Sequence, residues 1–165
     1  MALTIVLIRH GEAKLKELGQ TDFERELTDA GAKALREAFP RTLSLVDVTS
    51  ATELWMSPAT RARATAAIAN ETLGIETCRE VRSMYAQDQG EFLRELSQTN
   101  ADVIVAVGHI PFMEDMCARL CGQYLGFSTG AAAAVEIDDR AVRGLGSGLG
   151  RGRLKWFVQG PEVKL

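Results

Sequence analysis

The sequence has few of the residues that would support a disulfide framework, and it has no segment suited to a membrane. Of its 165 residues only Cys78, Cys117 and Cys121 are cysteines, and an odd count without a secretory signal argues against a disulfide framework. No apolar stretch approaches the roughly 20 residues needed to cross a bilayer. Met1-Ala2 leads into an apolar strand without the basic region and cleavage site of a signal peptide. We therefore expect a cytoplasmic protein without a membrane partner.

Histidine is equally scarce, since His10 and His109 are the only two in the chain. Cys117 and Cys121 are spaced to share one helix face and could form half of a metal site, but the sequence offers no second pair of ligands for them. We interpret both as buried apolar residues. The expectation is that the protein uses no metal and no cofactor.

Charge and length limit the class of protein further. A formal net charge of -3 at pH 7 gives no electrostatic basis for nucleic-acid binding. Hydrophobic residues make up 46% and charged residues 25%, which is the composition of a globular domain and not of a disordered or fibrous chain. The chain is long enough for one core and too short for two ordinary domains, so we expect a single domain over residues 1–165.

An apolar run near the start ends abruptly on a cation, an imidazole and a glycine. The run from Leu3 to Ile8 is rich in β-branched residues and too short for a packed helix, so it predicts a buried central strand of a parallel sheet. Arg9 and His10 follow at its carboxyl end, where open α/β sheets bind ligands, and Gly11 allows a sharp turn there. A guanidinium can hold a phosphoryl group through two hydrogen bonds, and a neutral imidazole can carry that group covalently. The pattern indicates phosphoryl transfer; the alternative is that these side chains only cap a strand.

A second segment, Ser57-Pro58, precedes a predicted helix over residues 59–73, with Ser57 as its N-cap. Arg61 lies in the first turn of this helix, where a cation gains nothing from the helix dipole. A bound anion would explain that position, whereas Arg63 fits a solvated arginine. We therefore place Arg61 over the carboxyl edge of the sheet.

The second histidine also follows a buried strand directly. The apolar run 102–107 ends on Gly108-His109, which predicts that His109 lies at the same sheet edge as His10. A lone histidine in such a place is more often structural. Because both histidines of the chain take this position, we favour a common site for them.

The remaining pattern fills out the helices and strands. A helix is predicted from Thr28, its N-cap, to a break at Pro40, and others over residues 89–96 and from Pro111 to Leu120. Residues 14–26 are predicted to form a loop that overhangs the site, and Met84-Tyr85 to begin another loop. The remaining strands are predicted over 53–56, 75–79 (an edge strand), 131–137 and 153–158, the last with Leu154, Trp156 and Val158 on one face. The basic, glycine-rich segment from Arg140 to Lys155 matches no nucleotide-binding loop and is interpreted as a mobile, solvated hairpin.

Four segments, taken in order, resemble the signatures of the histidine phosphatase superfamily, the phosphoglycerate mutase-like fold: Arg9-His10-Gly11-Glu12, Arg25-Glu26-Leu27-Thr28-Asp29-Ala30-Gly31, Ser57-Pro58-Ala59-Thr60-Arg61 and Gly108-His109-Ile110-Pro111. The resemblance extends from Ile5 to Ile137. Short length, Met84-Tyr85-Ala86 and Ser128-Thr129-Gly130-Ala131 most resemble the small SixA-type phosphohistidine phosphatases. The resemblance implies a three-layer α/β/α fold with a mostly parallel central sheet.

Carried over residue by residue, the resemblance implies that His10 is a nucleophile that becomes transiently phosphorylated. It also implies a phosphate pocket lined by Arg9, Gly11, Arg25, Arg61 and His109. Fixed cations beside an in-line nucleophile are the main contribution that a protein can make to phosphoryl transfer, so the chemistry of these residues agrees. We expect phosphate, sulfate or vanadate to bind in this pocket.

The chain departs from those relatives that cleave alcohol phosphomonoesters. These resemble one another in having a carboxylic acid after the second signature, where this chain has Met84-Tyr85-Ala86-Gln87, with Asp88 out of register. An alkoxide leaving group needs a positioned general acid more than the nitrogen of phosphohistidine does. We therefore expect simple alkyl phosphates to be poor substrates.

The favoured function is dephosphorylation of phosphohistidine in proteins, such as histidine phosphotransfer or similar signalling proteins. One alternative is a phosphatase or mutase of the same fold that acts on a small phosphorylated metabolite, with Asp88 or Glu91 as its acid. The other is a module that binds a phosphoprotein without catalysis, although binding alone could be managed by the arginines without His10 and His109.

Overall fold

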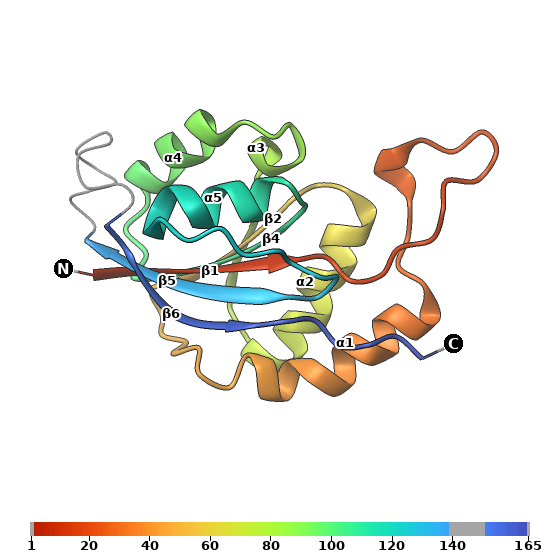
Figure 1. Ribbon diagram of the computed structural model, residues 1–165, viewed down its shortest axis with the longest axis horizontal. Coiled ribbons are helices and arrows are strands. Elements are labelled where there is room, and N and C mark those ends of the chain that lie inside the picture. The colour runs from red at the N-terminus through yellow and green to blue at the C-terminus, as the bar shows by residue number, and fades with distance from the viewer. Residues whose placement is uncertain (1, 139–150, 165) are drawn as a thin grey trace.

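One sheet runs through the computed structural model, which describes residues 2–138 and 151–164 (Figure 1). Its strand order is β3-β2-β4-β1-β5-β6. Strands β3, β2, β4 and β1 are parallel, whereas β5 pairs antiparallel with β1, and β6 with β5. The strands are β1 (Ala2–Arg9), β2 (Thr52–Met56), β3 (Thr77–Glu80), β4 (Val103–Gly108), β5 (Ala132–Asp138) and β6 (Arg153–Val158). The expected mostly parallel central sheet is confirmed.

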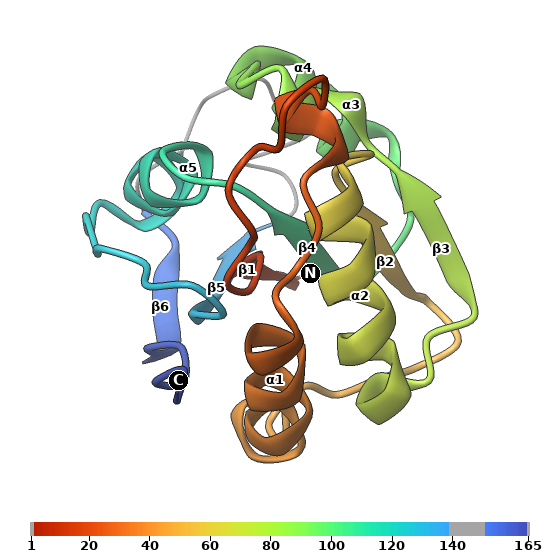
Figure 2. The same cartoon turned by 90° about the vertical axis from the view of Figure 1, so that its right-hand side faces the viewer.

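Helices cover both faces of this sheet. The helices α1 and α2 lie on one face, and α3, α4 and α5 on the other (Figures 1 and 2). Each face has its own buried cluster, with Phe39 on the first and Phe92 and Phe112 on the second. The expected three-layer α/β/α arrangement is confirmed. The helices are α1 (Asp29–Thr42), α2 (Thr60–Leu73), α3 (Arg82–Tyr85), α4 (Gln89–Gln98) and α5 (Phe112–Cys121), with a short 3₁₀ turn, η1 (Asp22–Glu24).

Strand β1 is central, as predicted, because its apolar residues face both layers of helices. Ile5 and Leu7 belong to the cluster on the α5 side, and Val6 and Ile8 to the cluster on the α1 side. Full burial of such a side chain contributes roughly 1.5–3 kcal/mol. The strand is thereby fixed on both faces, and its carboxyl end is a rigid point from which to hold a side chain.

Helix α1 is longer than predicted. It begins after Thr28, whose side chain accepts a hydrogen bond from the Gly31 amide as expected, but it continues through Pro40 to Thr42. Because proline has no amide proton, Pro40 at this late position leaves out only the helical hydrogen bond that its own nitrogen would donate. The next turn survives, since the Leu43 amide still donates to the Phe39 carbonyl at 2.9 Å.

Three other expectations need correction. Met84-Tyr85 belongs to the short helix α3 and does not begin a loop. The edge strand β3 begins at Thr77, two residues later than predicted. In β6 the expected common face is wrong: the register shifts opposite Ala134 and Val135, so Leu154 and Trp156 pack into clusters on opposite sides of the sheet.

The glycine-rich segment falls mostly outside the described residues, which omit 139–150. Of its described part, Arg153 and Lys155 lie in β6 and approach Glu136 at 3.2 and 3.9 Å. Cys117 and Cys121 are buried on α5 as free thiols, which confirms their interpretation as apolar residues. Within residues 2–138 and 151–164, no helix combines the length and the apolar character that a membrane span requires.

Candidate active site

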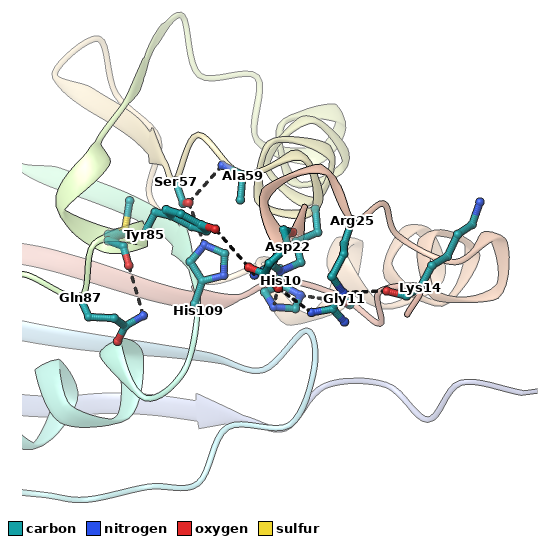
Figure 3. A network of polar contacts seen from close by, with 12 residues as sticks. His10, Gly11, Lys14, Asp22, Arg25, Ser57, Ala59, Tyr85, Gln87 and His109 are labelled. Atoms are coloured by element: carbon teal, nitrogen blue, oxygen red, sulfur yellow. Dashed lines mark hydrogen bonds and ion pairs between the residues drawn. The ribbon is translucent and has the colours of Figure 1, made fainter. Parts of the chain in front are cut away.

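Three parallel strands end at one edge of the sheet and bring the predicted residues together. β4 pairs in parallel with both β1 and β2, and backbone bonding continues past the strand ends. The His10 amide donates to the Gly108 carbonyl at 2.9 Å, and the Ser57 amide to the Val107 carbonyl at 2.9 Å. His10 and His109 therefore emerge side by side, with ring centroids 5.3 Å apart (Figure 3).

The hydrogen bonds of His10 define which of its ring nitrogens is available for attack. Nδ1 lies 2.7 Å from the carbonyl oxygen of Gly11, and because a carbonyl oxygen only accepts, Nδ1 carries the proton. The Nε of Arg61 donates to Nε2 at 3.3 Å. In the neutral ring, Nε2 is therefore unprotonated, and its lone pair faces the guanidinium of Arg61. The arrangement thus holds an unprotonated imidazole nitrogen beside a fixed cation.

Burial keeps both imidazoles neutral. The pKa of His10 falls to about 4, mainly because of desolvation; the neighbouring arginines also lower it, and the hydrogen bond to Gly11 raises it. The pKa of His109 falls to about 3, again because of burial first, then because a protonated His109 would be repelled by a protonated His10 and by the arginines. A protonated imidazole has no lone pair on Nε2, so these shifts keep His10 in its nucleophilic form at neutral pH.

We expect NMR titration of the ring protons to give a pKa of about 4 for His10. Unfolded histidines take up protons near pH 6.5, and the folded ring does so only at lower pH. The free energy of unfolding should therefore decrease as the pH falls from about 6.5 toward 4. The matched measurement is urea unfolding of the wild type and of His10→Gln, which should lose part of this dependence. A folded His10 that titrates near 6.5 would contradict the description of a desolvated ring.

Gly11 is required for close packing. A Cβ added there would lie 2.6 Å from Cδ1 of Leu35, and Gly11 is not among the residues with positive φ. Its amide donates to Oγ1 of Thr65 at 3.0 Å, and that hydroxyl donates to the carbonyl of Arg61 at 2.8 Å. These bonds tie the segment after β1 to the first turn of α2. The sequence predicted that Gly11 allows a sharp turn. The structure shows that a glycine is needed here because of close packing against Leu35.

Ser57 orients His109 and does not cap α2 as predicted. The N-cap of α2 is Ala59, without a side-chain cap. Oγ of Ser57 lies 2.7 Å from Nε2 of His109 and accepts from the Ala59 amide at 3.3 Å. In one of the two ring tautomers the hydroxyl donates its own proton to Nε2. The neutral His109 ring then carries its proton on Nδ1.

Two buried nitrogen atoms at this edge are without protein partners. Among the described residues, neither Nδ1 of His109 nor Nε of Arg9 has a hydrogen-bond partner, whereas Nη1 of Arg9 donates to the Phe127 carbonyl at 2.8 Å. A buried donor left unsatisfied costs about 1–3 kcal/mol. The oxygens of a bound anion are a chemically suitable partner for both.

Residues 13–26, here called the arm, leave the sheet edge and return over it (Figure 2). The arm is joined at its base by a bridge between Ala13 and Leu27. Its 3₁₀ turn rests on α3, where the rings of Phe23 and Tyr85 pack edge to face with centroids 5.2 Å apart. The expectation of an overhanging loop agrees with this path.

The arm places a carboxylate in the site that the sequence reasoning missed. Nη2 of Arg61 donates to Oδ2 of Asp22 at 3.0 Å, and Nη1 donates to the Asp22 carbonyl at 2.8 Å. Arg25 reaches the same carboxylate through Nη1 at 3.1 Å, and the hydroxyl of Tyr85 does so at 3.2 Å (Figure 3). Arg25 thus joins the site through Asp22. The available signal was that Asp22 precedes Arg25 by three residues, one helical turn.

The carboxylates that the sequence offered as acids are engaged elsewhere. Asp88 is the N-cap of α4 and accepts from the Glu91 amide at 3.0 Å. The side chain of Glu91 pairs with Arg94. These contacts lie within α4. Among the described residues, no three or more histidine, cysteine or acidic side chains are grouped so as to hold a metal ion.

Comparison with solved structures supports the fold. The protein histidine phosphatase SixA in complex with tungstate superimposes with a TM-score of 0.75 at 20% identity, covering 95% of this chain and 97% of that one. A putative phosphohistidine phosphatase SixA from Agrobacterium tumefaciens gives 0.74 at 24%, covering 94% and 97%. A mycobacterial glucosyl-3-phosphoglycerate phosphatase gives 0.68 at 16%, covering 98% and 100%.

Sequence comparison identifies the family. No curated protein sequence matches this chain. The family model of the histidine phosphatase superfamily, branch 1, matches residues 5–88, which include most of β1, the arm and all of α2. Because this match spans half of the 165 residues, the chain belongs to the histidine phosphatase superfamily.

Proposed function

We propose that the protein is a phosphatase that works through a covalent phosphohistidine on His10 and removes phosphoryl groups from phosphohistidine in proteins. One observation carries the proposal: the unprotonated Nε2 of buried His10 faces the guanidinium of Arg61 at 3.3 Å. A neutral nitrogen nucleophile held beside a fixed cation is suited to attack on a phosphoryl group. A site that only binds phosphate would not need an unprotonated imidazole nitrogen beside that cation.

The reaction has two displacements at phosphorus. In the first, the lone pair of Nε2 of His10 forms a bond to phosphorus, and the bond to the leaving nitrogen breaks. In the second, water attacks the phosphohistidine and gives up a proton, and the electron pair of the phosphorus–nitrogen bond returns to Nε2. The proton released by water balances the one that the leaving nitrogen takes up in the first step. Arg9, Arg61 and His109 donate to the equatorial oxygens, where negative charge is spread in the transition state. The hydrogen bond from Nδ1 to Gly11 holds the ring in one tautomer through both steps.

Three observations favour a phosphorylated protein as substrate. Similar folds include the protein histidine phosphatase SixA, which has been solved with the oxyanion tungstate. Asp88 and Glu91, the candidate acids for an alkoxide, are bound within α4. Leu15 and Leu18 of the arm are 84% and 107% exposed, and exposed apolar side chains fit a protein partner. We place the activity in the cytoplasm as part of this proposal.

A metabolite phosphatase is the second candidate, and the carboxylate of Asp22 favours it. This group lies where an acid for an ester leaving group could act, bonded to Arg61 at 3.0 Å. The similar fold of a glucosyl-3-phosphoglycerate phosphatase shows that the architecture also serves small phosphorylated substrates. The two candidates differ in the leaving group and not in the nucleophile.

The discriminating experiment compares kcat/KM for a phosphohistidine-bearing phosphotransfer protein, phosphoramidate, aryl phosphates and alkyl phosphates. We expect the phosphohistidine protein to be the best substrate, followed by phosphoramidate, aryl and then alkyl phosphates, since a departing alkoxide most needs a proton. Asp88→Asn and Glu91→Gln should leave this order unchanged. Efficient turnover of an alkyl metabolite, with the phosphohistidine protein inert, would make the metabolite phosphatase the better account.

A further inference from the structure

Arg9 is held at the sheet edge by the backbone of a segment that lies far along the chain. Its Nη1 donates to the carbonyl of Phe127 at 2.8 Å, while its Nε is buried without a partner among the described residues. The guanidinium is a planar fork, so a bond at one nitrogen constrains the direction of the other donors. The position of the Phe127 carbonyl therefore governs where the remaining donors of Arg9 point.

Glu114 binds the amide of the same phenylalanine. Its Oε2 accepts a hydrogen bond from the Phe127 amide at 2.8 Å, and its Oε1 accepts one from the hydroxyl of Tyr124 at 3.2 Å. Phe127 is 3% exposed, so its amide depends on this carboxylate for a partner. Phe127 thus connects Glu114, through its amide, to Arg9, through its carbonyl.

The carboxylate of Glu114 comes from the helix that follows His109. Glu114 lies in the first turn of α5, and the Met113 amide donates to the His109 carbonyl at 2.9 Å. A carboxylate in a first turn is stabilised by the partial positive charge of the helix N-terminus. The support for Arg9 is therefore built on the element that begins at the second histidine of the site.

A separate contact holds the residues on either side of Phe127. Nε2 of Gln159 donates to the Gly126 carbonyl at 2.7 Å, and its Oε1 accepts from the Ser128 amide at 2.9 Å. These bonds do not involve Glu114. Loss of its carboxylate should therefore disturb the backbone at Phe127 without releasing the whole segment.

We propose that Glu114 is a positioning residue that acts through Phe127 on Arg9, a role that rests on the proposed function of Arg9 as a donor to the phosphoryl oxygens. The carboxylate fixes the Phe127 amide, and the Phe127 carbonyl fixes Nη1 of Arg9. The remaining donors of Arg9 then meet the equatorial oxygens in the transition state. Glu114 takes no part in bond formation or proton transfer.

The test is Glu114→Ala, with Asp115→Ala as the matched control. Asp115 lies in the same first turn, so its removal takes away the same charge and the same interaction with the helix dipole. We expect Glu114→Ala to lower kcat/KM for nitrophenyl phosphate by about 10-fold to 100-fold, because small misplacements of a binding group are costly in phosphoryl transfer. Asp115→Ala should stay within about 3-fold of the wild type, since only the dipole interaction is lost.

Two milder variants separate the hydrogen bond from the fold. Glu114→Gln retains an oxygen for the Phe127 amide and should recover most of the activity. Glu114→Asp retains the charge but draws both oxygens back by one methylene group, so it should lose activity in the same direction as Glu114→Ala. Urea unfolding of each variant establishes that folded proteins are compared. Equal losses in Glu114→Ala and Asp115→Ala would overturn the proposal.

The decisive readout repeats these substitutions in an Arg9→Ala background. If Glu114 acts through Arg9, Glu114→Ala and Glu114→Asp should each change kcat/KM by less than about 2-fold once Arg9 is gone, because coupled residues are not additive. A purely structural role predicts the same loss with and without Arg9. That result would overturn the proposal.

Binding of inorganic phosphate distinguishes this proposal from the proposed covalent chemistry, because it needs no turnover. Calorimetric titration should show weaker binding in Glu114→Ala than in the wild type, and no further weakening in the Arg9→Ala background. If His10 becomes labelled in the wild type but the losses at Glu114 and Arg9 are additive, only the positioning role fails. If the wild type is never labelled but phosphate binding remains non-additive, the proposed function fails and the positioning of Arg9 stands.

Discussion

Replacement of His10 by alanine should lower kcat by about 10⁴-fold or more on every substrate, because the bond-forming nucleophile is lost. The binding of inorganic phosphate should change much less, since Arg9, Arg61 and His109 remain. The physical reason is that, in the proposed mechanism, one neutral nitrogen forms the bond to phosphorus and the surrounding donors hold the phosphoryl oxygens. Steady-state kinetics and phosphate titration of the same preparation measure the two effects.

His10 is 8% exposed, so the loss of its side chain must be separated from misfolding. His109→Ala is the matched control, since it removes the other buried imidazole of the pair without removing the nucleophile. It should lose less activity than His10→Ala and should still accept a phosphoryl group on His10. Equal residual activity in the two variants, with both folded, would count against a distinct nucleophilic role.

Arg61→Ala should weaken vanadate binding and lower kcat/KM by about 100-fold to 1000-fold, the range for loss of a preorganised donor at developing charge. In the structure its Nε donates to Nε2 of His10, and both terminal nitrogens donate to Asp22. Removing it takes away the cation beside the nucleophile and also releases the arm. Calorimetric titration with vanadate and kinetics with aryl phosphates measure both losses.

Arg63 provides the matched control for this substitution. It lies two residues further along α2 and is exposed, so Arg63→Ala removes the same charge from the same helix outside the site. We expect near wild-type binding and turnover. If Arg63→Ala weakened vanadate binding as much as Arg61→Ala, net charge and not the placement of Arg61 would be responsible.

Local sequence patterns predicted most of the fold. The apolar run of β1 and the residues that follow it predicted a buried central strand ending at a ligand-binding edge, because burial on both faces leaves a strong signal in sequence. Thr28 predicted the start of α1 because capping is a local interaction. Pro40 misled the prediction of the helix end, since a proline near the last turn removes a single hydrogen bond.

The predicted arrangement of the strands places the side chains of Arg9, His10, Arg61 and His109 at one edge of the sheet. It does not indicate which residues these side chains contact. Ser57 contacts His109 at 2.7 Å instead of capping α2, because tertiary contact outweighs the local capping preference. Gly11 packs on Leu35, which no local pattern could indicate. Both contacts join residues far apart in the sequence.

Asp22 was missed for the same reason. The search for an acid followed the position of the carboxylate in related phosphatases, which led to Asp88 and Glu91 on α4. The carboxylate at the site comes from the arm, and its path is set by the contacts of Phe23 with Tyr85 and of Arg25 with Lys14. A polar loop without periodicity does not reveal which of its side chains turns inward.

The central claim is that Nε2 of His10 carries the phosphoryl group, and the most direct measurement is trapping of that intermediate. The enzyme is mixed with nitrophenyl phosphate, quenched in alkali within milliseconds, digested and examined by mass spectrometry and phosphorus NMR. We predict a phosphoryl group that is stable in alkali and labile in acid, attached to Nε2 of His10, because Nδ1 is held by the Gly11 carbonyl at 2.7 Å. A phosphoryl group on His109, or full turnover by enzyme that never becomes labelled, would contradict the account.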